Sequence, residues 1–313
     1  MVSYIIRRVG ILIVTLVLVT VIGFLLVHAT PGDPAVAAAG PDADAETIEA
    51  TREALGLNRS LGAQFWEYAI GLVRLDFGTS FDGGRPVLDA ILERLPVTVS
   101  LVVASLVVSL LISIPLGIGT ALRRGTVWDR AGILVSSLGV ALPDFFVGLV
   151  LVLVLALQWG LFDATGYVSL ADDPAGWAYH LVLPALTLGT TVAAELTRHI
   201  RASVSDVLDL DYVRTARSKG LGSVRVVIKH ATRNAALPVV TVFGNQVARL
   251  LGGTVIVEQI FDLPGVGQLL VQSVFARDVP TILGLGLFIA MIVLVVNVLI
   301  DMSYGWLNPK VRS

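Results

Sequence analysis

Residues 97–122 read VTVSLVVASLVVSLLISIPLGIGTAL and contain no charged side chain. A helix needs about 20 apolar residues to cross a bilayer, and this run exceeds that length. Comparable apolar stretches lie at 9–28, 131–157, 181–200, 236–257 and 281–303. Because each is long enough to span lipid as a helix, we predict an all-α polytopic membrane protein with six transmembrane helices.

The composition supports a membrane protein and excludes several kinds of chemistry. Of the 313 residues, 55% are hydrophobic and 15% are charged, whereas soluble domains carry roughly 25% charged residues. There is no cysteine, which excludes disulfides, thiol catalysis and cysteine-ligated metals. The four histidines, His28, His180, His199 and His230, do not have the spacing of metal ligands. We therefore predict no metal site.

The first 30 residues have some features of a secretory signal, with Arg7 and Arg8 ahead of an apolar run. A signal-peptide core is about 7–15 residues long, and the run from Val9 to Val27 is closer to the length of a full span. We predict that residues 1–30 are an uncleaved first transmembrane helix.

Basic residues indicate which side of the membrane each loop occupies. Six spans place both termini on one side. That side also receives the link with Arg123, Arg124 and Arg130 and the loop 201–235, which is rich in arginine. The positive-inside rule assigns it to the cytoplasm. Residues 31–96 are then an extracytoplasmic loop, and residues 97–313 form a five-helix core with a cytoplasmic loop at 201–235.

The extracytoplasmic loop contains one clear helix signal. An acidic start at Asp44 precedes a helix-forming run to Leu55, and Gly56 follows as a stop. This loop is either a landing surface for a soluble partner or a cover packed over the helices.

Residues 211–221, here called the basic segment, read DYVRTARSKGL between two apolar runs. Leu208, Tyr212 and Ala216 recur at i+4 and predict one apolar stripe on a short helix. Gly220 is expected to end that helix, because glycine adopts the left-handed conformation without penalty. The alternative is a basic loop that only follows the positive-inside rule.

The phosphate-binding P-loop of many nucleotide-hydrolysing proteins is not found in this sequence. The phosphate-binding P-loop requires a Gly-Lys pair followed by Ser or Thr, and the sequence contains no Gly-Lys pair. The chain is therefore predicted to be a non-catalytic subunit, and any energy from ATP must come from another chain.

The whole chain resembles the permeases of ABC importers, in the dipeptide, oligopeptide and nickel branch, and its long first external loop resembles the B-type subunit. The amino-terminal half carries Arg7-Arg8, Pro31-Gly-Asp-Pro34, Leu55-Gly-Leu57, Asp76-Phe-Gly78 and Arg94-Leu-Pro96. The second half carries Tyr212 to Leu221, His230 to Pro238, Glu258 to Gly267, Arg277-Asp278-Val-Pro280 and Asn308-Pro309. The sequence departs from the general importer motif at Arg214, where that motif has an acidic residue.

The resemblance implies a type I ABC-importer permease fold and a role for the basic segment in coupling to an ATPase. The residues it assigns to that coupling are Asp211, Tyr212, Arg214, Thr215, Ala216, Arg217, Lys219, Gly220 and Leu221. A short helix there, with its cationic side chains exposed, would insert into a cleft of the ATPase. Motion of the ATPase would then push the fourth and fifth spans.

The resemblance also implies a bacterial plasma membrane protein and its partners. These are a homologous second permease, two ATPase subunits or domains, an extracytoplasmic substrate-binding protein and the lipid bilayer, with no nucleic acid. No cofactor is expected on this chain, since ATP and Mg²⁺ belong to the ATPase. Short peptides are the expected substrates, transported by alternating access, and nickel or another small solute is the alternative. A self-sufficient secondary transporter is a rival of another class, but it would need internal repeats or several carboxylates at one depth.

Charged groups within predicted spans are candidates for the substrate pathway, because ionisable residues are costly in lipid. Asp144 and Arg249 lie at similar predicted depths in the third and fifth spans, and Asn245 precedes Arg249 by four residues. We expect Asp144 and Arg249 to form an ion pair or to contact the charged ends of a peptide; a structural pair, or one that faces trapped water, is the alternative. Pro143 favours a kink beside Asp144. Glu195 is expected to be neutralised by Arg198 or Arg201.

Small residues repeat along the second span. Ser105, Ser109 and Ser113 recur every four residues and continue to Gly117. This spacing predicts close packing against another helix rather than a pore lining.

Overall fold

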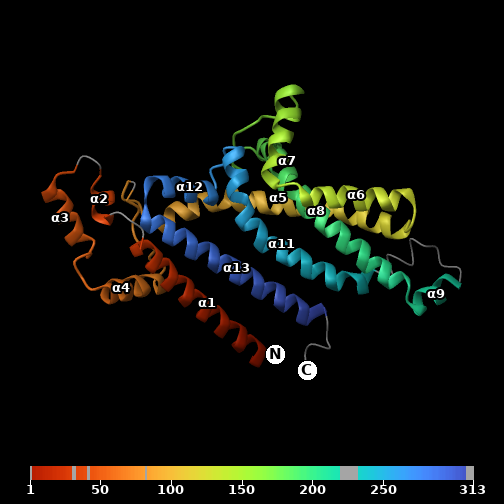
Figure 1. Cartoon of the computed structure of the whole chain (residues 1–313), viewed down its shortest axis with the longest axis horizontal. Coiled ribbons are helices and arrows are strands. Elements are labelled where there is room, and N and C mark those ends of the chain that lie inside the picture. The colour runs from red at the N-terminus through yellow and green to blue at the C-terminus, as the bar shows by residue number, and fades with distance from the viewer. Residues whose placement is uncertain (1, 30–32, 41–42, 82, 219–231, 308–313) are drawn as a thin grey trace. The chain divides into compact units, whose positions relative to one another are not determined.

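The structure is a computed structural model that describes residues 2–29, 33–40, 43–81, 83–218 and 232–307. The elements it describes are helices, apart from an isolated antiparallel bridge between Thr79 and Pro86. The helices are α1 (Val2–Ala29), α2 (Pro34–Ala39), α3 (Ala45–Ala54), α4 (Leu61–Val73), α5 (Val87–Leu122), α6 (Val127–Ala141), α7 (Asp144–Leu151), the π-helical η1 (Val152–Gln158), α8 (Pro174–Leu208), α9 (Asp211–Ser218), α11 (Thr232–Ile260), α12 (Val266–Ala276) and α13 (Val279–Leu307) (Figure 1).

Helix lengths agree with an all-α membrane protein. Each of the six predicted stretches falls on one of these helices or on the pair α6–α7 with η1. Within the described ranges, Val87–Leu122, Pro238–Ile260 and Val279–Ile300 are long and apolar enough to cross a membrane. The bent pair α6 and α7–η1 would make a fourth span, and Gly10–Leu26 is a shorter apolar helix. Helix α5 begins at Val87, so residues 87–96, which we placed in the loop, are helical.

The third predicted span is broken in the structure. Helix α6 ends at Ala141, and α7 starts at Asp144 after a bend of 102° (Figure 1). Leu142 is extended (φ −82, ψ 130), as expected for a residue before proline, and Pro143 lacks the N–H that would continue the helix. The predicted kink is confirmed in place. A continuous helix over 131–157 was wrong, and Asp144 is the first residue of a new helix.

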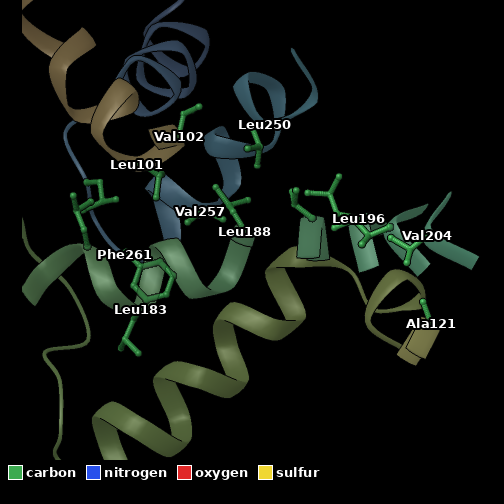
Figure 2. Packing of buried hydrophobic residues seen from close by; sticks show 14 of the residues in the cluster. Leu101, Val102, Ala121, Leu183, Leu188, Leu196, Val204, Leu250, Val257 and Phe261 are labelled. Carbon is green, nitrogen blue, oxygen red and sulfur yellow. The ribbon is translucent and has the colours of Figure 1, made fainter. Parts of the chain in front are cut away.

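The contacts define two compact units, residues 1–96 with 264–295 and residues 97–263 with 296–313. In the second unit α8 packs against α6, α7 and α11. Leu188, Leu250 and Val257 gather between the helices, with Leu183 and Phe261 beside them (Figure 2). Buried Glu258, near the end of α11, accepts a 2.7 Å hydrogen bond from Thr98 of α5. The core of this unit is therefore built on α8.

The small-residue stripe on α5 packs against α8, as predicted. Ser105, Ser109 and Ser113 are completely buried. A Cβ on Gly189 of α8 would lie 2.8 Å from the carbonyl oxygen of Ser105, and a Cβ on Gly117 would lie 2.7 Å from the side chain of Ile200. The two backbones approach so closely because neither glycine has a side chain.

The first unit contains α1, the helices α2 to α4, the start of α5, α12 and part of α13. Phe24 of α1 packs against Phe65 and Tyr68 of α4, with ring centroids 5.4 Å and 6.2 Å apart. Buried Asp278 accepts hydrogen bonds from Ser80 Oγ (2.5 Å) and the backbone N–H of Phe81 (3.0 Å). The carboxylate of Asp278 therefore holds the loop before α5 against the start of α13.

Helix α3 begins and ends as the sequence predicts. Asp44 accepts a 2.9 Å hydrogen bond from the N–H of Thr47, and the Thr47 side chain and backbone lower the pKa of Asp44. Gly56 follows the helix with φ +65, the left-handed conformation that glycine tolerates. Arg52 forms an ion pair with Asp33, which caps the preceding α2. The described residues between α1 and α5 thus form short capped helices.

Candidate functional site

A cavity of about 240 Å³ lies between α7, α8 and α11 in the second unit. Its polar lining comes from Asp144, Thr191, Gln246 and Arg249, and apolar walls come from residues such as Leu188. Opposite charges and two neutral hydrogen-bonding side chains therefore line one partly open pocket. This is the type of site at which orienting polar groups are set in an apolar pocket.

The break at Pro143 brings Asp144 into this cavity. Asp144 occupies the first turn of α7, where the helix dipole stabilises a negative charge. One of its carboxylate oxygens lies 3.9 Å from the position of a Cβ on Gly253, which also lines the cavity. Because Gly253 has no side chain, α11 approaches this carboxylate closely.

Arg249 does not pair with Asp144. Its Nη1 lies 3.0 Å from Oε2 of Glu195 on α8. The expected neutralisation of Glu195 by Arg198 or Arg201 was also wrong, because Glu195 faces α11, as does Thr191 one turn earlier. Asp144 and Arg249 nevertheless line the same cavity, so the structure brings the two predicted charges together without joining them.

Gln246 and Thr191 were not predicted as site residues. Only 3% of Gln246 and 9% of Thr191 are exposed, and in the described part of the chain Gln246 Oε1 and Thr191 Oγ1 have no hydrogen-bond partner. Asn245, the predicted residue, is exposed and does not line the cavity. On α11 both Asn245 and Gln246 lie within one turn of Arg249, so spacing along the helix favours neither.

The basic segment begins with α9, and one of its residues anchors it. Val213 is completely buried in the core cluster that contains Val204, Val207 and Leu208 of α8. The predicted stripe was therefore wrong: Leu208 belongs to α8, and Tyr212 is 40% exposed. The inward position is Val213, because α8 ends and the chain turns before α9 starts.

The structure describes the other residues of the basic segment as far as Ser218, where α9 ends. Asp211 and Thr215 are exposed, and the hydroxyl of Thr215 donates a 2.9 Å hydrogen bond to the carbonyl of Asp211. Arg214, Ala216 and Arg217 lie on α9, whose backbone is described at these positions. Lys219, Gly220 and Leu221 fall outside the described residues, as do His230 and Asn308-Pro309 from the motifs.

Two ion pairs connect the end of α8 to the first turn of α6 and to the turn before α6. Arg201 contacts the buried carboxylate of Asp129 with Nε and Nη2, at 2.5 and 2.9 Å. Arg124 contacts Asp209 at 2.8 Å on the exposed surface. Neither pair is predictable from local sequence patterns, since each joins segments separated by more than 70 residues. They fix the region from which α9 emerges.

Comparison with known proteins gives matches over nearly the whole chain. Residues 113–313 match the family described as binding-protein-dependent transport system inner membrane component, and residues 1–102 match its N-terminal family. The glutathione transport system permease protein GsiC of Escherichia coli is 42% identical over 312 residues, covering 100% of this chain and 99% of the relative. The Salmonella typhi protein of the same name is 41% identical over the same coverage.

A solved structure shares the fold. The MetNI methionine ABC transporter, in an inward-facing conformation, aligns with a TM-score of 0.55 and 15% identity over 70% of this chain and 96% of the other. A second crystal form gives a TM-score of 0.56. The helical architecture, the candidate spans and the full-length matches agree: this chain belongs to the family of binding-protein-dependent transport system inner membrane components and is a multi-pass ABC-importer permease of the peptide and nickel type.

Proposed function

We propose that this chain is the membrane-spanning permease subunit of an ATP-driven importer for short peptides. The observation that carries the proposal is the full-length similarity to permeases named for glutathione, which is itself a tripeptide. The cavity supports it, because a zwitterionic peptide presents an ammonium and a carboxylate, and Asp144 and Arg249 offer the complementary charges. Nickel or another small solute is the alternative substrate.

The chain is proposed to work within a larger complex. Its partners are a homologous second permease, two ATPase subunits or domains and an extracytoplasmic substrate-binding protein. ATP and Mg²⁺ are bound by the ATPase, and this chain contributes no catalytic residue. Both termini and the basic segment lie in the cytoplasm, as the distribution of arginine and lysine favours.

Coupling is proposed to run through α9. Its exposed residues, including Asp211 and Tyr212, contact the ATPase, while Val213 transmits the movement to the core around α8. The Arg201–Asp129 pair then carries the displacement of α8 to α6. Lys219, Gly220 and Leu221, which follow α9 in the sequence, are proposed to take part in the same coupling.

The substrate is proposed to pass along the cavity as the helices alternate between outward and inward access. Asp144 and Arg249 orient the charged ends of the peptide, and Asn245 extends the polar path on the exposed side of α11. The Arg249–Glu195 contact holds the guanidinium at the cavity while leaving several of its five N–H donors for a ligand.

Purification followed by reconstitution tests this function. The tagged chain is isolated from its native membrane with the subunits that co-purify and placed in liposomes with the binding protein. We expect ATP-dependent accumulation of radiolabelled glutathione or trialanine. Accumulation of nickel but neither peptide would contradict the peptide assignment. Flux through liposomes that contain this chain alone would contradict the dependence on an ATPase.

Two charge-neutralising variants test the pathway within the same assay. Asp144→Asn and Arg249→Gln are each expected to lower peptide uptake while the binding protein still stimulates ATP hydrolysis. If both variants transport peptide at the wild-type rate, these side chains do not orient the substrate.

A further inference from the structure

Gln246 and Thr191 present unsatisfied hydrogen-bonding atoms inside the same cavity. They come from different helices, α11 and α8, and both side chains are more than nine-tenths buried. Buried polar side chains in folded proteins nearly always have a hydrogen-bond partner. In the described part of the chain Gln246 Oε1 and Thr191 Oγ1 have none, so a partner from outside the chain is expected at this position.

The chemistry of the lining restricts what that partner can be. Gln246 Oε1 and the Asp144 carboxylate accept hydrogen bonds, and the Thr191 hydroxyl both donates and accepts. Arg249 supplies donors on the same wall, where Glu195 already holds one of them. The matching ligand brings N–H groups to Gln246 and a carboxylate to Arg249. A bare metal ion fits poorly, since the described residues contain no group of three acidic or histidine side chains.

Resting on the proposed function, we infer that Gln246 and Thr191 form a subsite that recognises the backbone amide of a peptide in transit. Gln246 Oε1 accepts the hydrogen bond of a peptide N–H, and Thr191 bonds the same amide group from α8. Asp144 and Arg249 bind the charged ends, which any zwitterion possesses. Gln246 and Thr191 thereby distinguish a peptide from an amino acid or another small zwitterion.

The test compares two substrates that differ by one hydrogen-bond donor. Two uptake rates are measured in liposomes with the complete complex. One is for trialanine, and the other is for trialanine methylated on the backbone nitrogen of its second residue. The discrimination ratio is the uptake rate of trialanine divided by that of the methylated form. Any preference of the binding protein is identical for all variants, so a change in the ratio between variants reports only the permease.

We expect Gln246→Leu to lower the discrimination ratio about two- to tenfold, the range that corresponds to one net hydrogen bond. Thr191→Val, which keeps the shape of the side chain, is expected to lower it in the same direction. Gln259→Leu is the matched control, because Gln259 is exposed on the same helix and does not line the cavity. Stimulation of ATP hydrolysis by the binding protein shows that each variant is assembled.

The outcomes separate the subsite from the function. Wild-type uptake of trialanine with an unchanged ratio in both Gln246→Leu and Thr191→Val overturns the subsite and leaves the peptide importer standing; this is the result expected if the two atoms bind only water. An equal change of the discrimination ratio in Gln259→Leu also overturns the subsite. If the wild-type complex imports neither glutathione nor trialanine, the proposed function fails and the subsite with it.

Discussion

Arg201 holds both carboxylate oxygens of Asp129, with Nε 2.5 Å from Oδ1 and Nη2 2.9 Å from Oδ2. The same carboxylate accepts a 2.9 Å hydrogen bond from the N–H of Gly125 in the turn before α6. Only 3% of Asp129 is exposed, and its partner on α8 lies two turns before the end of that helix. The pair therefore joins α6 to the part of α8 from which α9 continues.

Asp129→Ala is expected to destabilise the protein by about 3 kcal/mol, because it leaves Arg201 without its buried partner. Arg124→Ala is the control. It removes the Arg124–Asp209 pair, in which 60% and 65% of the side chains are exposed, and such pairs contribute at most about 1 kcal/mol. Thermal unfolding of the purified variants in detergent, followed by tryptophan fluorescence, measures both. Similar decreases of the unfolding temperature in the two variants would contradict the larger contribution assigned to the buried pair.

The close contact between α5 and α8 gives a second prediction. In Gly189→Ala the new methyl group would lie 2.8 Å from the carbonyl oxygen of Ser105 and 2.7 Å from Val108, so the helices must separate. We expect a lower yield of monodisperse protein and a lower unfolding temperature. Gly119→Ala adds a methyl group with no atom within 4 Å and is expected to behave as wild type. A tolerated Gly189→Ala would show that the stripe is loosely packed.

Anchoring of α9 is tested by Val213→Ser. The buried valine contacts the core of the second unit, and its replacement removes about 1–2 kcal/mol of apolar burial. We expect the number of peptides imported per ATP hydrolysed to fall, because α9 then moves without displacing α8. Val274→Ser makes the same replacement at an exposed position of α12, outside the basic segment, and serves as control. An unchanged ratio of uptake to hydrolysis in Val213→Ser would exclude Val213 as the transmitting residue.

Sequence patterns predicted features that depend on one helix or one turn. The uncharged run at 97–122, the helix stop at Gly56 and the packing stripe from Ser105 to Gly117 are examples, since each follows from length, backbone conformation or spacing alone. The kink at Pro143 also follows from local chemistry. Its 102° size does not, because it depends on how α7 packs against α8 and α11.

The polar cavity could be predicted only in part, for a physical reason. Spacing along α11 shows that Gln246 and Asn245 both lie near Arg249, but the rotation of α11 about its axis is set by packing against α8. The same rotation decides that Arg249 meets Glu195 rather than Asp144. Val213 was missed because the turn after Leu208 interrupts the helical period on which the predicted stripe depended.

Variants of Arg249 and Glu195 show which of these two side chains contacts the substrate and which only positions the other. If Arg249 binds the peptide carboxylate and Glu195 only holds the guanidinium, Arg249→Gln should reduce peptide uptake more than Glu195→Gln does. The double variant should then resemble Arg249→Gln alone, because Glu195 acts through the arginine. The measurement is the concentration dependence of ATP-driven trialanine uptake for the three variants. Additive losses in the double variant would show instead that Glu195 contacts the substrate independently of Arg249.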